Sequence, residues 1–328
     1  MRENRHINVL KGLGIFFVVA GHSGSCLTSF YYTFHMGLLF MISGWLLSEK
    51  AHEKASVFVK KRIRGVLVPY SVFFAVSIIY AELAAAWDGG FFPLTVNHLK
   101  AFALGGTYLS QYTVNLPLWY LFLYFIASII YFLLLRLSDR AKALTAVILI
   151  FVTIPFQNLL PDRPILFVNV LPPALVYMLF GYAVKRIVQE RGNIQAGIVL
   201  VFIGWYSSLI RGGGIDITHI TDNIYYVESF CTIMGLYLLA FKMRPSKILE
   251  YIGKRSLYIL GLHSLIANQV IRLSDFISAV LFIENPYIGS LLFTVIIIIL
   301  CCALADIYSQ VKTFLMIKGR GKCFHWKK

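Results

Sequence analysis

The sequence predicts an all-helical integral membrane protein, a bundle of about ten transmembrane helices with both termini in the cytoplasm. Composition is the first reason, since 59% of the 328 residues are hydrophobic and 14% are charged, whereas a soluble domain carries about 25% charged residues. The second reason is that the hydrophobic residues fall into separate runs, and a run of about 20 residues can cross a bilayer. The third is the alternation of positive charge between the connecting segments.

Ten apolar runs account for the predicted helices, and the segments between them are too short for a separate soluble domain. We therefore treat residues 1–328 as a single membrane-embedded domain that ends in a basic cytoplasmic tail at about 308–328. The first run has a basic start but no clear small-residue cleavage site, which predicts a retained helix and not a signal peptide. The runs cover residues 9–27, 30–48, 66–87, 116–135, 143–160, 165–184, 194–210, 223–241, 256–273 and 287–307.

The positions of lysine and arginine orient this bundle. With the N-terminus in the cytoplasm, the cytoplasmic segments hold 26 of the 30 Lys and Arg residues, and the other side keeps Lys100, Arg163, Arg211 and Arg272. Cytoplasmic loops of membrane proteins carry the excess positive charge, so both termini are predicted to be cytoplasmic. The formal net charge of +15 then follows from topology and from attraction to anionic lipid headgroups, and it requires no nucleic-acid partner.

Two segments on the predicted outer side are polar enough to meet a substrate. Residues 88–115 combine aromatic residues with Gly-Gly pairs, and residues 211–222 have the sequence RGGGIDITHITD. A plain solvated loop is the alternative interpretation of both. The five cysteines show no CxxC or zinc-ligand spacing, so we expect neither a disulfide framework nor a metal site.

His22 is the ionisable residue whose position most suggests chemistry. It follows Lys11 by eleven residues, which at about 100° per residue places both side chains on one helix face, about 16 Å apart along the axis. With Lys11 at the cytoplasmic boundary, His22 lies near the middle of a hydrocarbon core about 30 Å thick, where an ionisable group needs a cavity or a partner. A neutral imidazole in such a site can take a proton from a hydroxyl group, so we expect His22 to be a general base.

Two more histidines lie inside predicted helices. His35 lies near the outer end of the second run, and His263 follows Lys254 and Arg255 by about two turns. A buried histidine is commonly a structural hydrogen-bond partner, and that alternative stays open for both residues.

A cluster of cations precedes the third predicted helix in the sequence KKRIRGVLVPY, from Lys60 to Tyr70. Arg62 and Arg64 are spaced to hold phosphates, and guanidinium groups bind phosphates in a bidentate manner, which suits the phosphates of coenzyme A. The alternative is the charge cluster that commonly ends a translocated segment on the cytoplasmic side. The sequence alone favours neither.

Six segments together resemble the acyltransferase family 3 proteins, integral-membrane enzymes that acylate surface polysaccharides and lipid-linked glycans. The segments occur in the family's order and cover most of the chain. They are RHINVLKGLGIFFVVAGH (Arg5 to His22), YTFHMGLLFMISGWLL (Tyr32 to Leu47), FVKKRIRGVLVPY (Phe58 to Tyr70), LPLWYLFLYF (Leu116 to Phe125), LFGYAVKR (Leu179 to Arg186) and IGKRSLYILGLHS (Ile252 to Ser264).

The resemblance implies roles for particular residues. The family's first helix carries a basic residue, ten further residues and a histidine, which implies a catalytic His22 supported by Lys11. Arg62 and Arg64 match the family's Arg-x-Arg motif before the third helix, which implies that they bind the coenzyme A donor. His35 matches the histidine of the family's second helix, and Trp119 matches the tryptophan of its LWYL segment.

The chain departs from many members of the family at two positions. It has Asn8 where many have aspartate and Gly37 where many have proline, and Asn8 cannot act as an acid or an ionic partner. With Lys11, Asn8 instead resembles the fucose 4-O-acetylase-like subset. That similarity implies O-acetylation of a sugar hydroxyl.

We therefore predict a multi-pass plasma-membrane O-acyltransferase with His22 as its base. It moves an acetyl or similar short acyl group from acyl coenzyme A, with acetyl coenzyme A as the expected donor and no metal, to a hydroxyl of a cell-surface polysaccharide or lipid-linked glycan. The main alternative is a transporter or exporter of polysaccharide intermediates, because buried histidines also suit transport pathways. The hydropathy pattern shows neither the inverted repeat nor the paired broken helices that would favour transport. A purely structural protein would leave the register of Lys11 and His22 unexplained.

Overall fold

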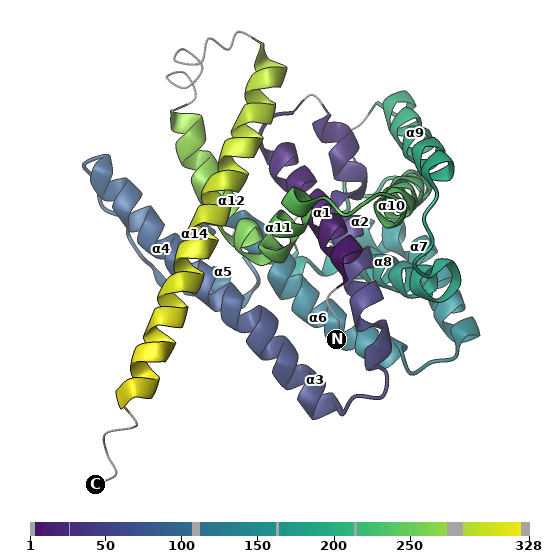
Figure 1. Ribbon diagram of the computed structural model, residues 1–328, viewed down its shortest axis with the longest axis horizontal. Coiled ribbons are helices and arrows are strands. Elements are labelled where there is room, and N and C mark those ends of the chain that lie inside the picture. Colours follow the sequence, from purple (N-terminus) through teal and green to yellow (C-terminus); the bar gives the residue numbers. More distant parts are fainter. Residues whose placement is uncertain are drawn as a thin grey trace.

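The computed structural model describes residues 4–25, 27–106, 112–161, 164–212, 215–273 and 285–322, and these ranges form helices joined by turns (Figure 1). The helices are α1 (Arg5–His22), α2 (Thr28–Leu47), η1 (Ser48–Lys50), α3 (Ala55–Arg62), η2 (Ile63–Leu67), α4 (Val68–Trp87), α5 (Val96–Ala103), η4 (Leu116–Leu118), α6 (Trp119–Leu134), α7 (Asp139–Asn158), η5 (Ile165–Val170), α8 (Leu171–Ala183), η6 (Val184–Val188), α9 (Ile194–Ile210), α10 (Ile224–Lys242), α11 (Lys247–Lys254), α12 (Ser256–Arg272) and α14 (Pro286–Lys322).

Seven helical stretches within the described ranges are long and apolar enough to cross a membrane. Each coincides with one of the ten predicted runs, so the all-helical membrane class is confirmed and seven of the predicted spans are supported. The other three runs are helical as well, but α9 and α12 have 17 residues each, and α1 carries Arg5, Asn8 and Lys11 among its 18 residues. The seven stretches are Thr28–Lys50, Ala55–Trp87, Leu116–Leu134, Asp139–Asn158, Ile165–Val188, Ile224–Lys242 and Pro286–Phe314.

Helix α2 forms the centre of the bundle. In its most apolar window 78% of the residues are buried, against 17% for the corresponding window of α7. It packs against α1 on one side and against α8 and α10 on the other. By contrast, α4, α7, α9 and α14 expose many large apolar side chains, and in Figure 1 they lie around the outside of the bundle. Such exposed apolar faces are costly in water and suit contact with lipid.

Helix α1 is held against α11, and this contact positions Lys11. The side chain of Asn4 caps α1 by accepting hydrogen bonds from two backbone N–H groups of the first turn. Glycines then allow backbone contact between the two helices, since a Cβ atom on Gly12 would lie 2.1 Å from the carbonyl oxygen of Leu249. A side chain at Gly12 would therefore push α11 away from the turn that carries Lys11.

An ion pair strengthens the same contact at its polar end. The Arg5 guanidinium donates to the carboxylate of Glu250 at 2.8 Å, and Lys254 approaches the other carboxylate oxygen to 3.0 Å. The hydrogen bond from Arg5, followed by that from Lys254, holds the pKa of the Glu250 carboxyl below its usual range. Glu250 therefore stays ionised and keeps the start of α1 attached to α11.

Two segments that were predicted to be loop and tail contain helix. The outer segment 88–115 contains the short helix α5, whose Phe102 ring stacks on Tyr70 of α4 at 5.0 Å, while residues 107–111 lie outside the described ranges. The predicted basic tail at 308–328 begins inside the long helix α14, which ends at Lys322, and residues 323–328 lie outside the described ranges. Cys231, Cys301 and Cys302 are free thiols, and Cys26 and Cys323 lie outside the described ranges.

Candidate active site

Two cavities lie beside α1 and adjoin at two shared residues, Tyr120 of α6 and Leu260 of α12. We name them the His22 cavity and the Lys11 cavity, after the α1 residue in each wall. Their volumes are about 300 Å³ and about 200 Å³ respectively. The wall of the His22 cavity also includes Val18, Tyr32, His35, Met36, Leu116, Pro117, Trp119, Phe167, Asp216, Ile217 and Thr218.

His22 is the last residue of α1. The helix ends here because the chain turns through Ser23 and Gly24, and Gly24 adopts a φ of 72°, a conformation that glycine reaches without strain. The predicted run continued to residue 27, so the imidazole lies at a helix end, exposed to the cavity, and not inside a continuous helix. Lys11, from the same helix, lines the adjoining cavity.

His263 packs against His22 with 5.4 Å between the ring centroids. Its ring is fully buried, and its Nδ1 lies 3.0 Å from the carbonyl oxygens of both Ile259 and Leu260. Because a carbonyl oxygen accepts and cannot donate, this contact assigns the proton to Nδ1 and leaves a lone pair on Nε2. Among the described residues nothing partners that buried Nε2. His263 therefore brings an unused hydrogen-bond acceptor to the side of His22.

His35, like His263, forms a hydrogen bond through Nδ1 to a backbone carbonyl of its own helix. It is buried, and its Nδ1 donates to the carbonyl oxygen of Tyr31 at 2.6 Å, which leaves Nε2 as the acceptor. The ring of Tyr32 makes edge-on contacts with both histidines of the cavity wall, with centroids 6.1 Å from His22 and 5.0 Å from His35. The structure thus brings His22, His35 and His263 to one region of the bundle from α1, α2 and α12.

Aromatic rings form another part of the wall of the His22 cavity. Trp119, which the sequence matched to the family's LWYL segment, packs against Phe167 with ring centroids 4.5 Å apart. Phe167 and its neighbour Leu166 have φ values of 51° and 60° within η5. Each such non-glycine residue costs about 1–3 kcal/mol, so the surrounding packing must hold this turn in place. The strained turn is what brings Phe167 to the cavity.

The segment Ile215–Ile220 closes the cavity on the side remote from Lys11, and two buried amides anchor it. Gln157 of α7 donates to the Ile217 carbonyl at 3.0 Å and accepts from the Ile220 N–H at 2.7 Å. Asn169 donates to the Thr218 carbonyl at 2.8 Å. The sequence identified 211–222 as polar enough to meet a substrate, and this anchoring argues against a freely solvated loop at Ile215–Ile220.

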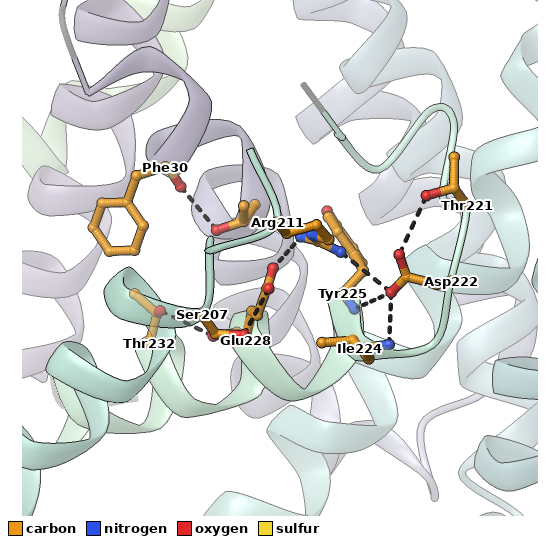
Figure 2. A network of polar contacts seen from close by, with 10 residues as sticks. Phe30, Ser207, Arg211, Thr221, Asp222, Ile224, Tyr225, Glu228 and Thr232 are labelled. Atoms are coloured by element: carbon orange, nitrogen blue, oxygen red, sulfur yellow. Dashed lines mark hydrogen bonds and ion pairs between the residues drawn. The ribbon is translucent and has the colours of Figure 1, made fainter. Parts of the chain in front are cut away.

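A buried ion pair anchors the two ends of the same loop (Figure 2). Arg211, just after α9, forms a hydrogen bond with Glu228 of α10 and pairs with Asp222 at 3.3 Å. Glu228 is fully buried, and its second oxygen accepts a hydrogen bond from Ser207 at 2.8 Å. Figure 2 shows Arg211 between the two carboxylates, so the loop leaves α9 and enters α10 at fixed points.

Arg62 and Arg64 have different surroundings. Arg62 lies over the Phe58 ring and donates to the hydroxyl of Tyr124 at 3.2 Å, and Tyr124 is part of the wall of the Lys11 cavity. Arg64 is exposed one half-turn further on, in the π-helical turn η2. Gly65 and Val66 of this turn also line the Lys11 cavity. The structure therefore brings Arg62 to the Lys11 cavity, with Arg64 on the exposed surface nearby.

Several cavity residues carry no signal in the sequence. Tyr120 and Leu260 lie on apolar helix faces, where their positions between two cavities depend on the packing of α12 against η4, the turn that leads into α6. Asp216 and Thr218 are within the predicted polar loop, yet nothing in its sequence distinguishes them from Asp222 or Thr221. Among the residues that the structure describes, no group of three or more His, Cys, Asp or Glu side chains is arranged to hold a metal ion.

The comparisons with known proteins identify the class. The sequence model of the acyltransferase family 3 domain, described as an acyltransferase domain, matches residues 4–308. The chain belongs to this family, and it is a membrane acyltransferase. Neither a curated protein nor a solved structure matches it.

Proposed function

We propose that this acyltransferase moves an acetyl or similar short acyl group from acyl coenzyme A to a hydroxyl of a cell-surface polysaccharide or lipid-linked glycan. The observation that carries the proposal is the pair of adjoining cavities, with His22 in one wall and Lys11 in the other. Two substrates that approach from opposite ends of the bundle can meet at Tyr120 and Leu260. The protein acts in the plasma membrane, with the end that carries Lys11 and Arg62 facing the cytoplasm.

The donor binds at the cationic end. Arg62, beside the Lys11 cavity, and the exposed Arg64 attract the phosphates of coenzyme A, and guanidinium groups suit this task because they donate in a bidentate manner. Lys11 lies further along the same path. The thioester arm extends through the Lys11 cavity, so that the acyl group reaches Tyr120 and Leu260 beside His22.

His22 is the general base. It takes the proton from the acceptor hydroxyl while the hydroxyl oxygen attacks the thioester carbonyl carbon. The C–S bond then breaks, coenzyme A leaves as a thiolate that receives the proton, and the acyl group remains on the sugar as an ester. General-base catalysis of this kind contributes about 10²–10⁴-fold in rate.

His35 assists from the second helix. Its Nδ1 is occupied by the Tyr31 carbonyl, so Nε2 is available to accept a hydrogen bond from the acceptor or from a water molecule in the cavity. The resemblance of the first helix to the fucose 4-O-acetylase-like subset supports a sugar hydroxyl as the acceptor and acetyl coenzyme A as the donor.

The test is the acetyl content of surface polysaccharide, measured by proton NMR, from cells that carry the wild-type chain, the His22→Ala chain or no chain. A chain with His52→Ala is the matched control, because His52 is an exposed histidine that belongs to the wall of neither cavity. Acetyl signals with the wild type and His52→Ala alone support the proposal. Equal signals in all four samples contradict it, and accumulation of unexported glycan without the chain would indicate a transporter.

A further inference from the structure

The charge in the His22 cavity comes from the loop that closes it. Among the described residues of the cavity wall, Asp216 is the one acid, and it shares that wall with His22 of α1 and with Tyr32 and His35 of α2. Its carboxylate interacts electrostatically with Tyr32 and with His35. The cations of the proposed donor site belong to the other cavity, so the two substrates meet walls of opposite charge.

One carboxylate oxygen of Asp216 is already used and the other is free. Oδ1 accepts hydrogen bonds from the backbone N–H of Thr218 at 2.6 Å and from the Thr218 hydroxyl. Among the described residues none donates to Oδ2. The turn therefore fixes the direction of the carboxylate and leaves one oxygen with unused acceptor capacity.

The loop is held rigidly enough to act as a binding element. Gln157 and Asn169 hold it at three backbone groups, and Arg211 anchors its ends through Asp222 and Glu228. A binding residue on such a loop is positioned before the ligand arrives, which lowers the entropy cost of binding. The loop thus supplies a preorganised acceptor beside the aromatic wall of Trp119.

We propose that Asp216 binds the acceptor through its hydroxyl groups and selects an uncharged, hydroxyl-rich sugar over an anionic one. This inference rests on the proposed acyl transfer. A carboxylate oxygen accepts hydrogen bonds from sugar hydroxyls, while the apolar face of the ring packs on Trp119. An acceptor that carries its own carboxylate or phosphate meets like-charge repulsion in a partly enclosed site, and such repulsion is an effective source of specificity.

The experiment uses the purified full chain in lipid nanodiscs with acetyl coenzyme A. The acceptor probes are methyl α-fucopyranoside, which is neutral, and methyl glucuronide, which is anionic. Acetylated product is measured by mass spectrometry. Coenzyme A release without acceptor, in which water takes the place of the sugar hydroxyl and acetate is formed, is measured with a thiol reagent. The variants are Asp216→Asn, which keeps the bond to the Thr218 N–H but removes the charge, and Asp88→Asn, an exposed acid outside both cavities, as the control.

We expect Asp216→Asn to raise the KM for the neutral acceptor about tenfold. The preference of the enzyme for the neutral acceptor over the anionic one should become smaller. Coenzyme A release without acceptor should stay within about twofold of wild type. Asp88→Asn should match the wild type.

An unchanged KM and an unchanged preference between the two acceptors in Asp216→Asn would overturn the inference. Equal losses of activity with both acceptors, accompanied by a lower melting temperature, would also overturn it, because they indicate a structural role. A wild-type chain that transfers to neither sugar but releases coenzyme A contradicts the neutral-sugar inference alone. One that neither transfers nor releases coenzyme A contradicts the proposed function.

Discussion

At the scale of single residues, the packing of the His263 ring against His22 predicts a specific role for the second imidazole. His263 is held by the Ile259 and Leu260 carbonyls, and its ring centroid lies 5.4 Å from that of His22. Its Nε2 has no hydrogen-bond partner among the described residues. If His22 donates one N–H to that acceptor, its other nitrogen is left as the base, and its ring orientation is fixed. His263 would then be a positioning residue, because it acts through His22.

Substitutions of His263 by side chains of different length separate this positioning role from simple packing. Glutamine can place an oxygen near the position of Nε2, asparagine is too short, and leucine fills space without an acceptor. We expect His263→Leu and His263→Asn to lower kcat about tenfold with little change in either KM, because about 1.4 kcal/mol of alignment is lost. His263→Gln should recover most of the activity, measured as coenzyme A release. Equal activities for the glutamine and leucine variants would show that His263 only fills space.

The two arginines of the Arg-x-Arg motif should also differ in their contributions. Arg62 contacts Tyr124 in the wall of the Lys11 cavity, whereas Arg64 is exposed. We expect Arg62→Ala to raise the KM for acetyl coenzyme A about tenfold or more and Arg64→Ala by about two- to threefold, since an exposed charge contributes less. Steady-state kinetics at two salt concentrations measures this. The same effect in both variants would mean that the donor reaches both guanidinium groups.

At the scale of elements, the α9–α10 hairpin owes its loop geometry to an ion pair. The side chains of Arg211 and Glu228 are 13% and 0% exposed, whereas the pair Arg272–Asp88 is 51% and 56% exposed. A buried charge that loses its partner is strongly destabilising, while an exposed pair contributes little. The two pairs therefore form a matched comparison within one chain.

Breaking the buried pair should lower stability more than breaking the exposed one. We expect Arg211→Met to destabilise the fold by about 3–5 kcal/mol, because Glu228 is left buried without its cation, and Arg272→Met by about 0–1 kcal/mol. The double variant Arg211→Met/Glu228→Leu should recover much of the loss. Thermal unfolding of the purified chain followed by tryptophan fluorescence provides the comparison. A double variant as unstable as Arg211→Met would show that Arg211 acts by packing alone.

At the scale of the whole molecule, the proposal requires the two cavities to communicate with opposite sides of the membrane. The positive charges predict that the end with His52 is cytoplasmic and that the end with His219 is external. In a variant with the five native cysteines changed to serine, we expect a membrane-impermeant maleimide to label His219→Cys in intact cells and His52→Cys only after lysis. Both positions are exposed. The opposite pattern would reverse the topology and place the donor site outside.

Much of this architecture follows from local properties of the sequence. Runs of apolar residues predicted the seven long helices, because a membrane-spanning helix needs a continuous apolar stretch of sufficient length in its own sequence. The spacing of Lys11 and His22 predicted a shared helix face, and the structure places them in adjoining cavities. The end of α1 was placed at residue 27, too late, because the turn at Gly24 depends on how α1 meets α2.

The sequence by itself determined the helical membrane class, the cationic end of the bundle and the family, and it predicted a catalytic role for the first-helix histidine. These are properties of composition, period and motif, which are written in consecutive residues. Only the tertiary structure decided that His263 lies beside His22, that Asp216 faces the same cavity, and that Tyr120 and Leu260 separate it from the cavity of Lys11. These contacts join segments far apart in the chain. They exist because the packing of α12 against α1 and against η4, together with the anchored loop, leaves space at those side chains and not at others.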